Sequence, residues 1–201
     1  YMNLDESVVI PYQKLDNIDS AVDLFMNHFN KRDKIGILVD EDPDGFCSAA
    51  MMYLYIKKTD SEYPVKYILH KRAKAHGLSD DVDIPTDVKL LVIPDAGTND
   101  TEQCKCLFEK GVNILILDHH EKEEDNKYAL IVNNQMSDEY SNKSLCGAGV
   151  VYRFLQALDD WLWNEYADDY LDLCALANIS DVMDMRSYET RYLTDLGLLN
   201  I

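Results

Sequence analysis

The sequence has 201 residues, 47% of them hydrophobic, with 19 basic and 37 acidic side chains and a formal net charge of −18. This is the composition of a globular protein, and no apolar run reaches the roughly 20 residues that span a bilayer, so no membrane partner is expected. The acidic balance argues against a broad nucleic-acid-binding surface, which would be basic.

The five cysteines are odd in number, are scattered along the chain, and mostly lie in apolar stretches. This usage favours a reducing compartment and small buried side chains over a disulfide framework. Cys104 and Cys106 lie two residues apart on a predicted helix, so they point to different sides. Residues 1–7 do not begin a signal peptide. We therefore expect a cytoplasmic protein.

Apolar patterns predict strands that alternate with helices over the first two thirds of the chain. The predicted helices are 18–31, 46–57 and 98–110, and the predicted strands are 35–39, 65–69, 88–93, a run that begins at residue 112, and 129–132. These strands are short and continuously apolar, which is typical of strands buried on both faces of a parallel sheet. Residues 70–83 are polar and predict a loop or a short irregular helix.

The last third of the chain predicts three helices, at 147–163, 167–179 and 188–197. The whole pattern predicts an α/β fold: a parallel sheet of about five strands, helices on both of its faces, and a helical C-terminal third.

Short polar side chains precede two of the predicted helices and can cap them. Asp16 or Asn17 can cap the first helix, and Thr98 or Asn99 can cap the helix that ends near residue 110. Gly111 then follows as the residue that lets the chain leave that helix.

Carboxylates follow three of the predicted strands at the point where each strand ends. The first strand leads into Asp40-Glu41-Asp42-Pro43-Asp44-Gly45, the third into Asp95-Ala96-Gly97, and the run from residue 112 into Asp118-His119-His120. In parallel sheets ligands bind at the carboxyl ends of the strands. The sequence therefore predicts that these groups meet at one edge.

The run from Asp40 to Gly45 also resembles the opening of an EF-hand calcium loop. The twelfth position of such a loop would be Met51, where a bidentate Glu is required, and a strand rather than a helix precedes the run. We reject the EF-hand. Acids this close repel one another unless a cation lies between them, so a metal site of another kind is the economical explanation.

Asp181 follows an apolar helical segment late in the chain, and Asp184, three residues later, is the competing candidate. A donor set of many carboxylates and one or two imidazoles suits Mn²⁺ or Mg²⁺ better than Zn²⁺. Carboxylates from several strands can hold two such ions about 3.5–4 Å apart and promote displacement at phosphorus. The residues thus predict a two-metal phosphoesterase.

The motifs, in this order, resemble those of the DHH phosphoesterase superfamily, which is named for the triplet seen here as Asp118-His119-His120. The chain looks most like the RecJ branch, whose members are 5′-to-3′ exonucleases on single-stranded DNA. Further similar stretches are Ile68-Leu69-His70-Lys71-Arg72 with His76-Gly77-Leu78, Leu145 to Val150, and Glu189 to Leu193. Other branches carry a His where this chain has Leu38, with Asp40 in the RecJ-like place.

The resemblance implies a role for each matching residue. It implies that Asp42, helped by Asp40, holds one metal ion, that Asp44, His119 and Asp181 hold a second, and that Asp95 bridges the two, with Mn²⁺ preferred and Mg²⁺ as the alternative. Asp118 would orient a histidine, and His120 would face the scissile phosphate as general acid or charge stabiliser.

Four further residues are candidates for substrate contact. Arg72 and His76 would touch a phosphate or the leaving group, with ordinary exposed polar residues as the alternative; His76 stands where the RecJ pattern has Tyr. Gly147 and Gly149 would let backbone N–H groups approach a phosphate, with a helix entry turn as the alternative.

We expect residues 1–201 to form a single DHH domain, without the second, C-terminal domain that RecJ-like enzymes carry. The expected partner is single-stranded DNA or a short oligonucleotide. Two alternatives remain open. One is hydrolysis of a small substrate (an oligoribonucleotide, cyclic dinucleotide or pyrophosphate), which the acidity favours because a small ligand needs no long basic groove. The other is a non-catalytic scaffold in a replication or repair assembly.

Overall fold

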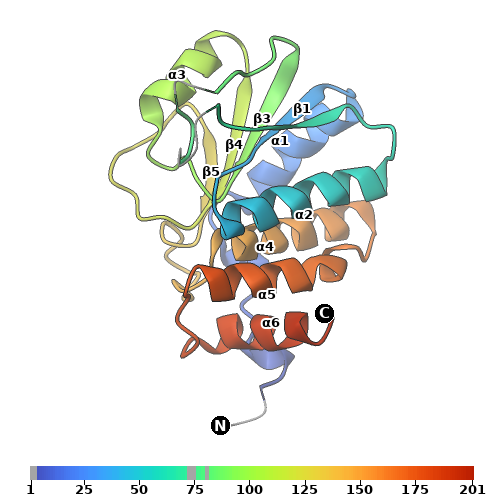
Figure 1. The fold of residues 1–201 in the computed structure, drawn as a ribbon, viewed down its shortest axis with the longest axis vertical. Coiled ribbons are helices and arrows are strands. Elements are labelled where there is room, and N and C mark those ends of the chain that lie inside the picture. The colour runs from blue at the N-terminus through green and yellow to red at the C-terminus, as the bar shows by residue number, and fades with distance from the viewer. Residues whose placement is uncertain (1–3, 72–75, 80–81) are drawn as a thin grey trace.

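The computed structural model describes residues 4–71, 76–79 and 82–201. Its centre is a five-stranded, fully parallel sheet in the order β2-β1-β3-β4-β5 (Figure 1). The strands are β1 (Lys34–Leu38), β2 (Val65–Ile68), β3 (Val88–Pro94), β4 (Asn113–Asp118) and β5 (Leu130–Asn133). The predicted parallel sheet is confirmed.

Side chains of the strands alternate between two apolar layers, one on each face of the sheet. In β3, Leu90 and Val92 join the larger layer, and Leu91 and Ile93 join the smaller one. The larger layer lies under α1 (Ile18–Asn30), α2 (Pro43–Thr59) and α4 (Gly147–Leu162), and the smaller one contains Cys104 of α3 (Thr101–Glu109). Helices therefore cover both faces, as predicted.

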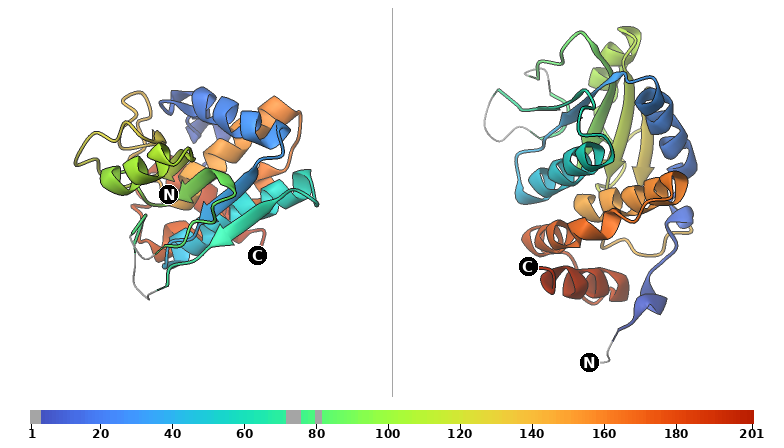
Figure 2. Two further views of the ribbon diagram at one scale, coloured as in Figure 1. Left: turned by 90° about the horizontal axis from the view of Figure 1, so that it is seen from above. Right: turned by 90° about the vertical axis from the view of Figure 1, so that its right-hand side faces the viewer.

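The helical last third continues the larger layer outward. Helix α4 packs directly on the sheet, whereas α5 (Leu171–Ser180) packs on α2 and α4, and α6 (Tyr188–Leu198) packs on α5. Figures 1 and 2 show α5 and α6 stacked at the end of the molecule away from α3. Short 3₁₀ helices lie at Glu6–Val8, Tyr12–Lys14 and Ala167–Tyr170. None of the described helices combines the length and apolarity needed to cross a bilayer.

Helix starts differ from the sequence expectations in two places. Helix α2 begins at Pro43 rather than at residue 46, because Asp42 accepts a hydrogen bond from the N–H of Gly45 and proline suits the first helical position. The N-cap of α3 is Asp100 rather than Thr98 or Asn99, because those two side chains bond to other segments.

Asn17 occupies the N-cap position of α1, but its side chain donates to the carbonyl of Ile131 instead of capping the helix. The expected end of α3 is confirmed, since Gly111 has a φ of +80° just after it. Cys104 is buried and Cys106 is exposed, as their spacing predicted.

The chain order places a topological switch point between β1 and β3. From β1 the chain moves outward to β2, and it returns to build β3, β4 and β5 on the other side of β1. In open α/β sheets such a switch point is the usual place for a ligand, at the carboxyl ends of the strands.

Candidate metal centre

The turn after β1 supplies three aspartates in five residues. Asp40 is 3% exposed, Asp42 caps α2, and Asp44 lies buried in the first turn of that helix. Asp44 accepts hydrogen bonds of 2.7 Å from the backbone N–H groups of Gly147 and Ala148 at the start of α4. A helix N-terminus presents free N–H groups, and here two of them hold the side chain of Asp44 in one orientation.

Asp95 follows β3 directly and lies at the centre of the carboxylates. Its backbone has a φ of +70°, an uncommon conformation for a residue with a side chain, and it is 1% exposed. Burial, together with the neighbouring charges of Asp44, Asp42 and Asp118, raises its pKa well above the usual range. Its Oδ1 accepts no hydrogen bond from any described residue.

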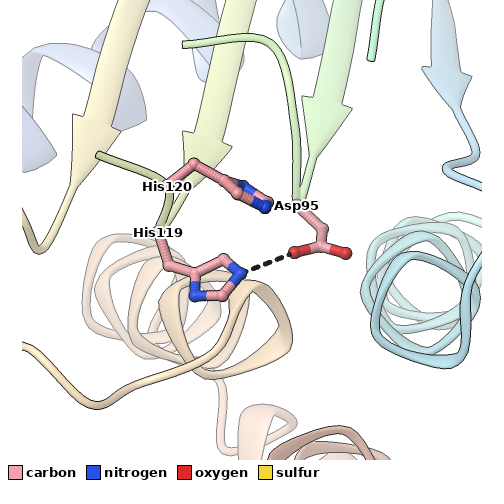
Figure 3. Close-up of side chains that lie close together, drawn as sticks. All are labelled: Asp95, His119 and His120. Carbon is pink, nitrogen blue, oxygen red and sulfur yellow. Dashed lines mark ion pairs between the residues drawn. The ribbon is translucent and has the colours of Figure 1, made fainter. Parts of the chain in front are cut away.

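His119 faces this carboxylate from the end of β4. Its Nε2 lies 3.3 Å from Oδ1 of Asp95, 3.8 Å from Oδ2 of Asp44 and 3.7 Å from Oδ2 of Asp181. Figure 3 shows the ring of His119 and the carboxylate of Asp95 pointing toward each other. One imidazole is thus surrounded by acids that come from β3, α2 and the end of α5.

The candidate ligand atoms fall into overlapping groups in which all atoms lie within 4.8 Å of one another. One group comprises Asp40, Asp42 and Asp95, another Asp44, His119 and Asp181, and a third Asp95, His119 and His120. Asp95 belongs to the first and the third of these groups. Its Oδ1 also lies 3.3 Å from Nε2 of His119, which is a member of the second group. This is the arrangement in which one carboxylate can bridge two cations.

Divalent cations fit this set of residues. Oδ1 of Asp95 is buried and accepts no hydrogen bond from a described residue, and the acids around this carboxyl raise its pKa, so a cation held there would offset their repulsion. Oxygen donors outnumber imidazoles, which suits Mn²⁺ or Mg²⁺.

The structure distinguishes the two late aspartates. Asp181 is the residue after α5 and reaches His119, whereas Asp184 forms hydrogen bonds and an ion pair with Arg186 and belongs to none of the groups found among the described residues. The hydrogen bonds from Arg186 lower the pKa of Asp184 to about 2. Between them Val182 has a φ of +55°, an uncommon backbone conformation for a β-branched residue.

Asp118 and His120 form a hydrogen-bonded pair beside the ligand groups. Oδ1 of Asp118 lies 2.7 Å from Nδ1 of His120, while Oδ2 accepts from the backbone N–H and hydroxyl of Thr98. Burial alone would raise the pKa of Asp118, but the hydrogen bonds from His120 and Thr98 outweigh it and hold that pKa below its usual range. The same bond, which His120 donates to Asp118, raises the pKa of His120.

The four expected substrate contacts stay predictions. Arg72 lies outside the described residues. His76 lies near the centre, with its Nδ1 2.7 Å from Oδ2 of Asp40. The N–H of Gly147 is taken by Asp44, and a Cβ on Gly147 would lie 2.2 Å from Oδ1 of Asp95, so this glycine permits close approach of α4. Gly149 is buried, and a Cβ there would lie 2.4 Å from the side chain of Leu145.

Sequence reasoning missed residues that hold the Asp118–His120 pair in place. Asn133, at the end of β5, donates to the hydroxyl of Thr98 and to the carbonyl of His120. Both Thr98 and Asn133 follow buried strands, so the pattern that identified the acids also applies to them. Asp100 contacts the segment that carries His76, and no local signal in the sequence marks it.

The sequence profile of the DHH family, N-terminal domain, matches residues 34–178. The chain belongs to the DHH family. Every candidate ligand except Asp181 lies inside the matched range.

Two relatives of this DHH chain are named as single-strand DNA exonucleases. A Bacillus subtilis protein named as an SPbeta prophage-derived single-strand DNA-specific exonuclease, YorK, is 43% identical over 100% of this chain and 34% of its own length. The single-stranded-DNA-specific exonuclease RecJ of Haemophilus influenzae is 31% identical over 98% of this chain and 36% of its own. The chain therefore spans roughly a third of the length of these relatives.

Among solved structures, the exonuclease RecJ bound to manganese superposes with a TM-score of 0.80 at 22% identity, over 98% of this chain and 49% of that one. At this identity the likeness shows a shared fold.

Proposed function

We propose that this DHH domain carries the catalytic centre of a two-metal phosphodiesterase that degrades single-stranded DNA from its 5′ end. The observation that carries the proposal is the set of six candidate ligands: Asp40, Asp42, Asp44, Asp95, His119 and Asp181 fall into two groups around the buried carboxylate of Asp95. A cluster of acids with a purely structural role would be expected to pair with Lys or Arg side chains. Among the described residues, the ion-pair partner that Asp95 and Asp181 share is instead the imidazole of His119, which can itself bind a metal ion.

In this proposal Asp40, Asp42 and Asp95 hold one divalent cation, Mn²⁺ or Mg²⁺, and Asp44, His119 and Asp181 hold the other, with Asp95 shared. When bound, two such cations would supply a water of lowered pKa as the nucleophile and would offset charge on the attacking and leaving oxygens. The helix N-terminus at Gly147 and Ala148 fixes Asp44, so one ligand is already oriented by the fold.

His120 is suited to the leaving oxygen. Its Nδ1 is held by Asp118, which leaves Nε2 as the ring nitrogen that can face a substrate. The hydrogen bond to Asp118 favours the protonated ring, which can donate a proton or stabilise negative charge in the transition state. Asp118 acts through His120 by fixing its tautomer and orientation.

The substrate class is supported by the relatives, which are named as single-strand-specific DNA exonucleases. One observation favours a second candidate, a small substrate such as a dinucleotide or pyrophosphate. The chain carries a net charge of −18, whereas binding a long phosphate backbone calls for basic side chains.

The test is a nuclease assay with Mn²⁺ on four substrates: 5′-labelled single-stranded DNA, the matching RNA, a dinucleotide and pyrophosphate. The wild type is compared with His119→Ala and with Asp184→Ala, which removes a nearby acid outside the ligand groups. We expect the wild type and Asp184→Ala to release the label from single-stranded DNA as a mononucleotide, the first product. His119→Ala should release none.

Turnover of the dinucleotide or pyrophosphate alone would favour the small-substrate candidate. If nothing is turned over while Mn²⁺ still binds in a calorimetric titration, residues 1–201 do not carry out the proposed reaction by themselves, and a scaffold role or dependence on a further domain replaces the proposal.

A further inference from the structure

Residues 76–78 are joined to the protein by two carboxylates: Asp40 after β1, which is buried, and Asp100 after β3, which is partly buried. Asp40 accepts hydrogen bonds from Nδ1 of His76 and from the N–H of Gly77, at 2.7 and 2.8 Å. Asp100 accepts from the N–H of Leu78 at 2.6 Å, through Oδ2. Three consecutive residues thus each donate to one of two acids.

Asp100 fits closely against this segment. Gly77 has a φ of +65°, and a Cβ on it would lie 2.4 Å from Oδ2 of Asp100. Asp100 stands at the N-cap position of α3, but its side chain makes no capping hydrogen bond. Its carboxylate is therefore directed to the segment and not to its own helix.

The segment carries His76 to the side of His120. The two rings meet edge to face, with centroids 4.8 Å apart and planes at 71°. Both histidines line a pocket of about 300 Å³ together with Asp100, Asp118, Thr98 and Asn99. The pocket adjoins the ring that the proposed reaction places at the leaving oxygen, and its volume is at the lower end of that of small-molecule sites.

We propose that Asp100 is a positioning residue: it holds residues 76–78 so that His76 forms a wall of the substrate pocket beside His120. The role of this pocket in the reaction rests on the proposed function, whereas the positioning of His76 does not. Asp100 belongs to none of the candidate ligand groups found in the described residues. The hydrogen bond between Asp100 and Leu78 therefore does not compete with cation binding. Asp40, in contrast, both accepts hydrogen bonds from this segment and is a candidate ligand.

The first test reads the position of His76 without using activity. The protein has five histidines, so ¹³C-labelled histidine gives few ring C–H signals, and His76→Ala assigns the signal of His76. Spectra are recorded with Mg²⁺, which is diamagnetic. We expect the His76 signal to move in Asp100→Ala and to stay near its wild-type position in Asp100→Asn, because an amide oxygen can still accept from Leu78.

Gly77→Ala disturbs the same contact by changing the segment instead of the acid. It leaves Asp100 in place but displaces residues 76–78, because the added Cβ strains a positive φ and overlaps with Asp100. The His76 signal should move there too. Glu102→Ala removes an exposed acid two residues further along the same helix and is the matched control, which should leave the signal unchanged.

The second test is a double-mutant cycle on the oligonucleotide substrate. Asp100→Ala and His76→Ala should each lower kcat/KM by roughly 10- to 100-fold, the range for residues that orient a functional side chain. The double variant should be no worse than His76→Ala, because Asp100 acts through His76. Losses that multiply would contradict the proposal, as would an Asp100→Asn variant as impaired as Asp100→Ala.

A His76 signal that is unchanged in both Asp100→Ala and Gly77→Ala would overturn the proposal outright. If circular dichroism shows that Asp100→Ala is unfolded, Gly77→Ala alone decides. If the wild type turns over no substrate, the proposed function fails, while the spectra still decide whether Asp100 positions His76.

Discussion

Oδ2 of Asp44 in α2 lies 2.7 Å from the backbone nitrogen of Gly147 in α4, although the two residues are 103 positions apart in sequence. The contact joins the first turns of two helices at the candidate metal centre. It gives a buried carboxylate the positive end of a helix, and it brings α4 so close to Asp95 that only glycine fits at position 147.

Substitution Gly147→Ala should therefore damage the metal centre. The added Cβ would meet the carboxylate of Asp95, so α4 or Asp95 must move. We expect stability to fall by about 1–3 kcal/mol, as in other overpacked cores, and Mn²⁺ affinity to fall by at least about tenfold. Thermal unfolding and calorimetric titration measure the two effects.

The control is Gly111→Ala, which also strains a positive φ but meets nothing within 4 Å. It should lose stability and keep its Mn²⁺ affinity. Equal affinities for wild type and Gly147→Ala would show that α4 does not fix the centre.

Substitution Asp95→Asn should stabilise the metal-free protein. Three neighbouring acids surround this carboxyl and, with burial, raise its pKa, so removing its charge relieves repulsion at neutral pH. The gain should be on the order of 1–3 kcal/mol in urea unfolding. At 100 times Kd, Mn²⁺ should stabilise the wild type by about 2.7 kcal/mol and the variant far less.

The control is Asp87→Asn, which changes an exposed acid paired with Lys34. It should alter neither the stability of the metal-free protein nor the stabilisation by Mn²⁺. A metal-free Asp95→Asn protein less stable than the wild type would contradict the repulsion that we infer.

The two late aspartates should behave differently. Asp181→Ala should weaken Mn²⁺ binding by at least about tenfold, because its carboxylate reaches His119. Asp184→Ala should bind Mn²⁺ as the wild type does, because that side chain is paired with Arg186. Calorimetric titration of both variants is the measurement, and the reverse order would show that residues 181–184 lie differently around a bound cation.

Asp118→Asn should reduce turnover more than metal binding. The amide keeps a hydrogen-bond acceptor for Thr98 but removes the charge that favours the protonated ring of His120. We expect kcat to fall by roughly 10²- to 10⁴-fold, the contribution of a general acid, with Mn²⁺ affinity nearly unchanged.

Glu124→Gln, which changes an exposed acid in the loop after the triplet that does not line the pocket, is the control for charge alone and should keep its activity. An Asp118→Asn enzyme with wild-type kcat would remove His120 from the proposed role.

The sequence by itself determined the fold class and identified most residues of the candidate centre. A strand buried in a parallel sheet needs a continuous apolar run, and polar residues directly after that run lie at the carboxyl edge of the sheet. The run and the polar residues together occupy about ten consecutive residues, so they can be recognised in the sequence. Asp40, Asp95 and Asp118 were recognisable for this reason. Because the strands β1, β3 and β4 are adjacent in the sheet, these acids also converge, as expected.

Only the tertiary structure decided which groups each polar residue meets. Whether Asp181 or Asp184 faces His119 depends on the turn at Val182 and on Arg186. The partner of the Gly147 amide depends on how α4 packs against α2, and the attachment of residues 76–78 depends on Asp40 and Asp100, which follow different strands. These contacts join segments 22 to 104 residues apart, and no local pattern encodes them, because helix packing and chain direction set them together.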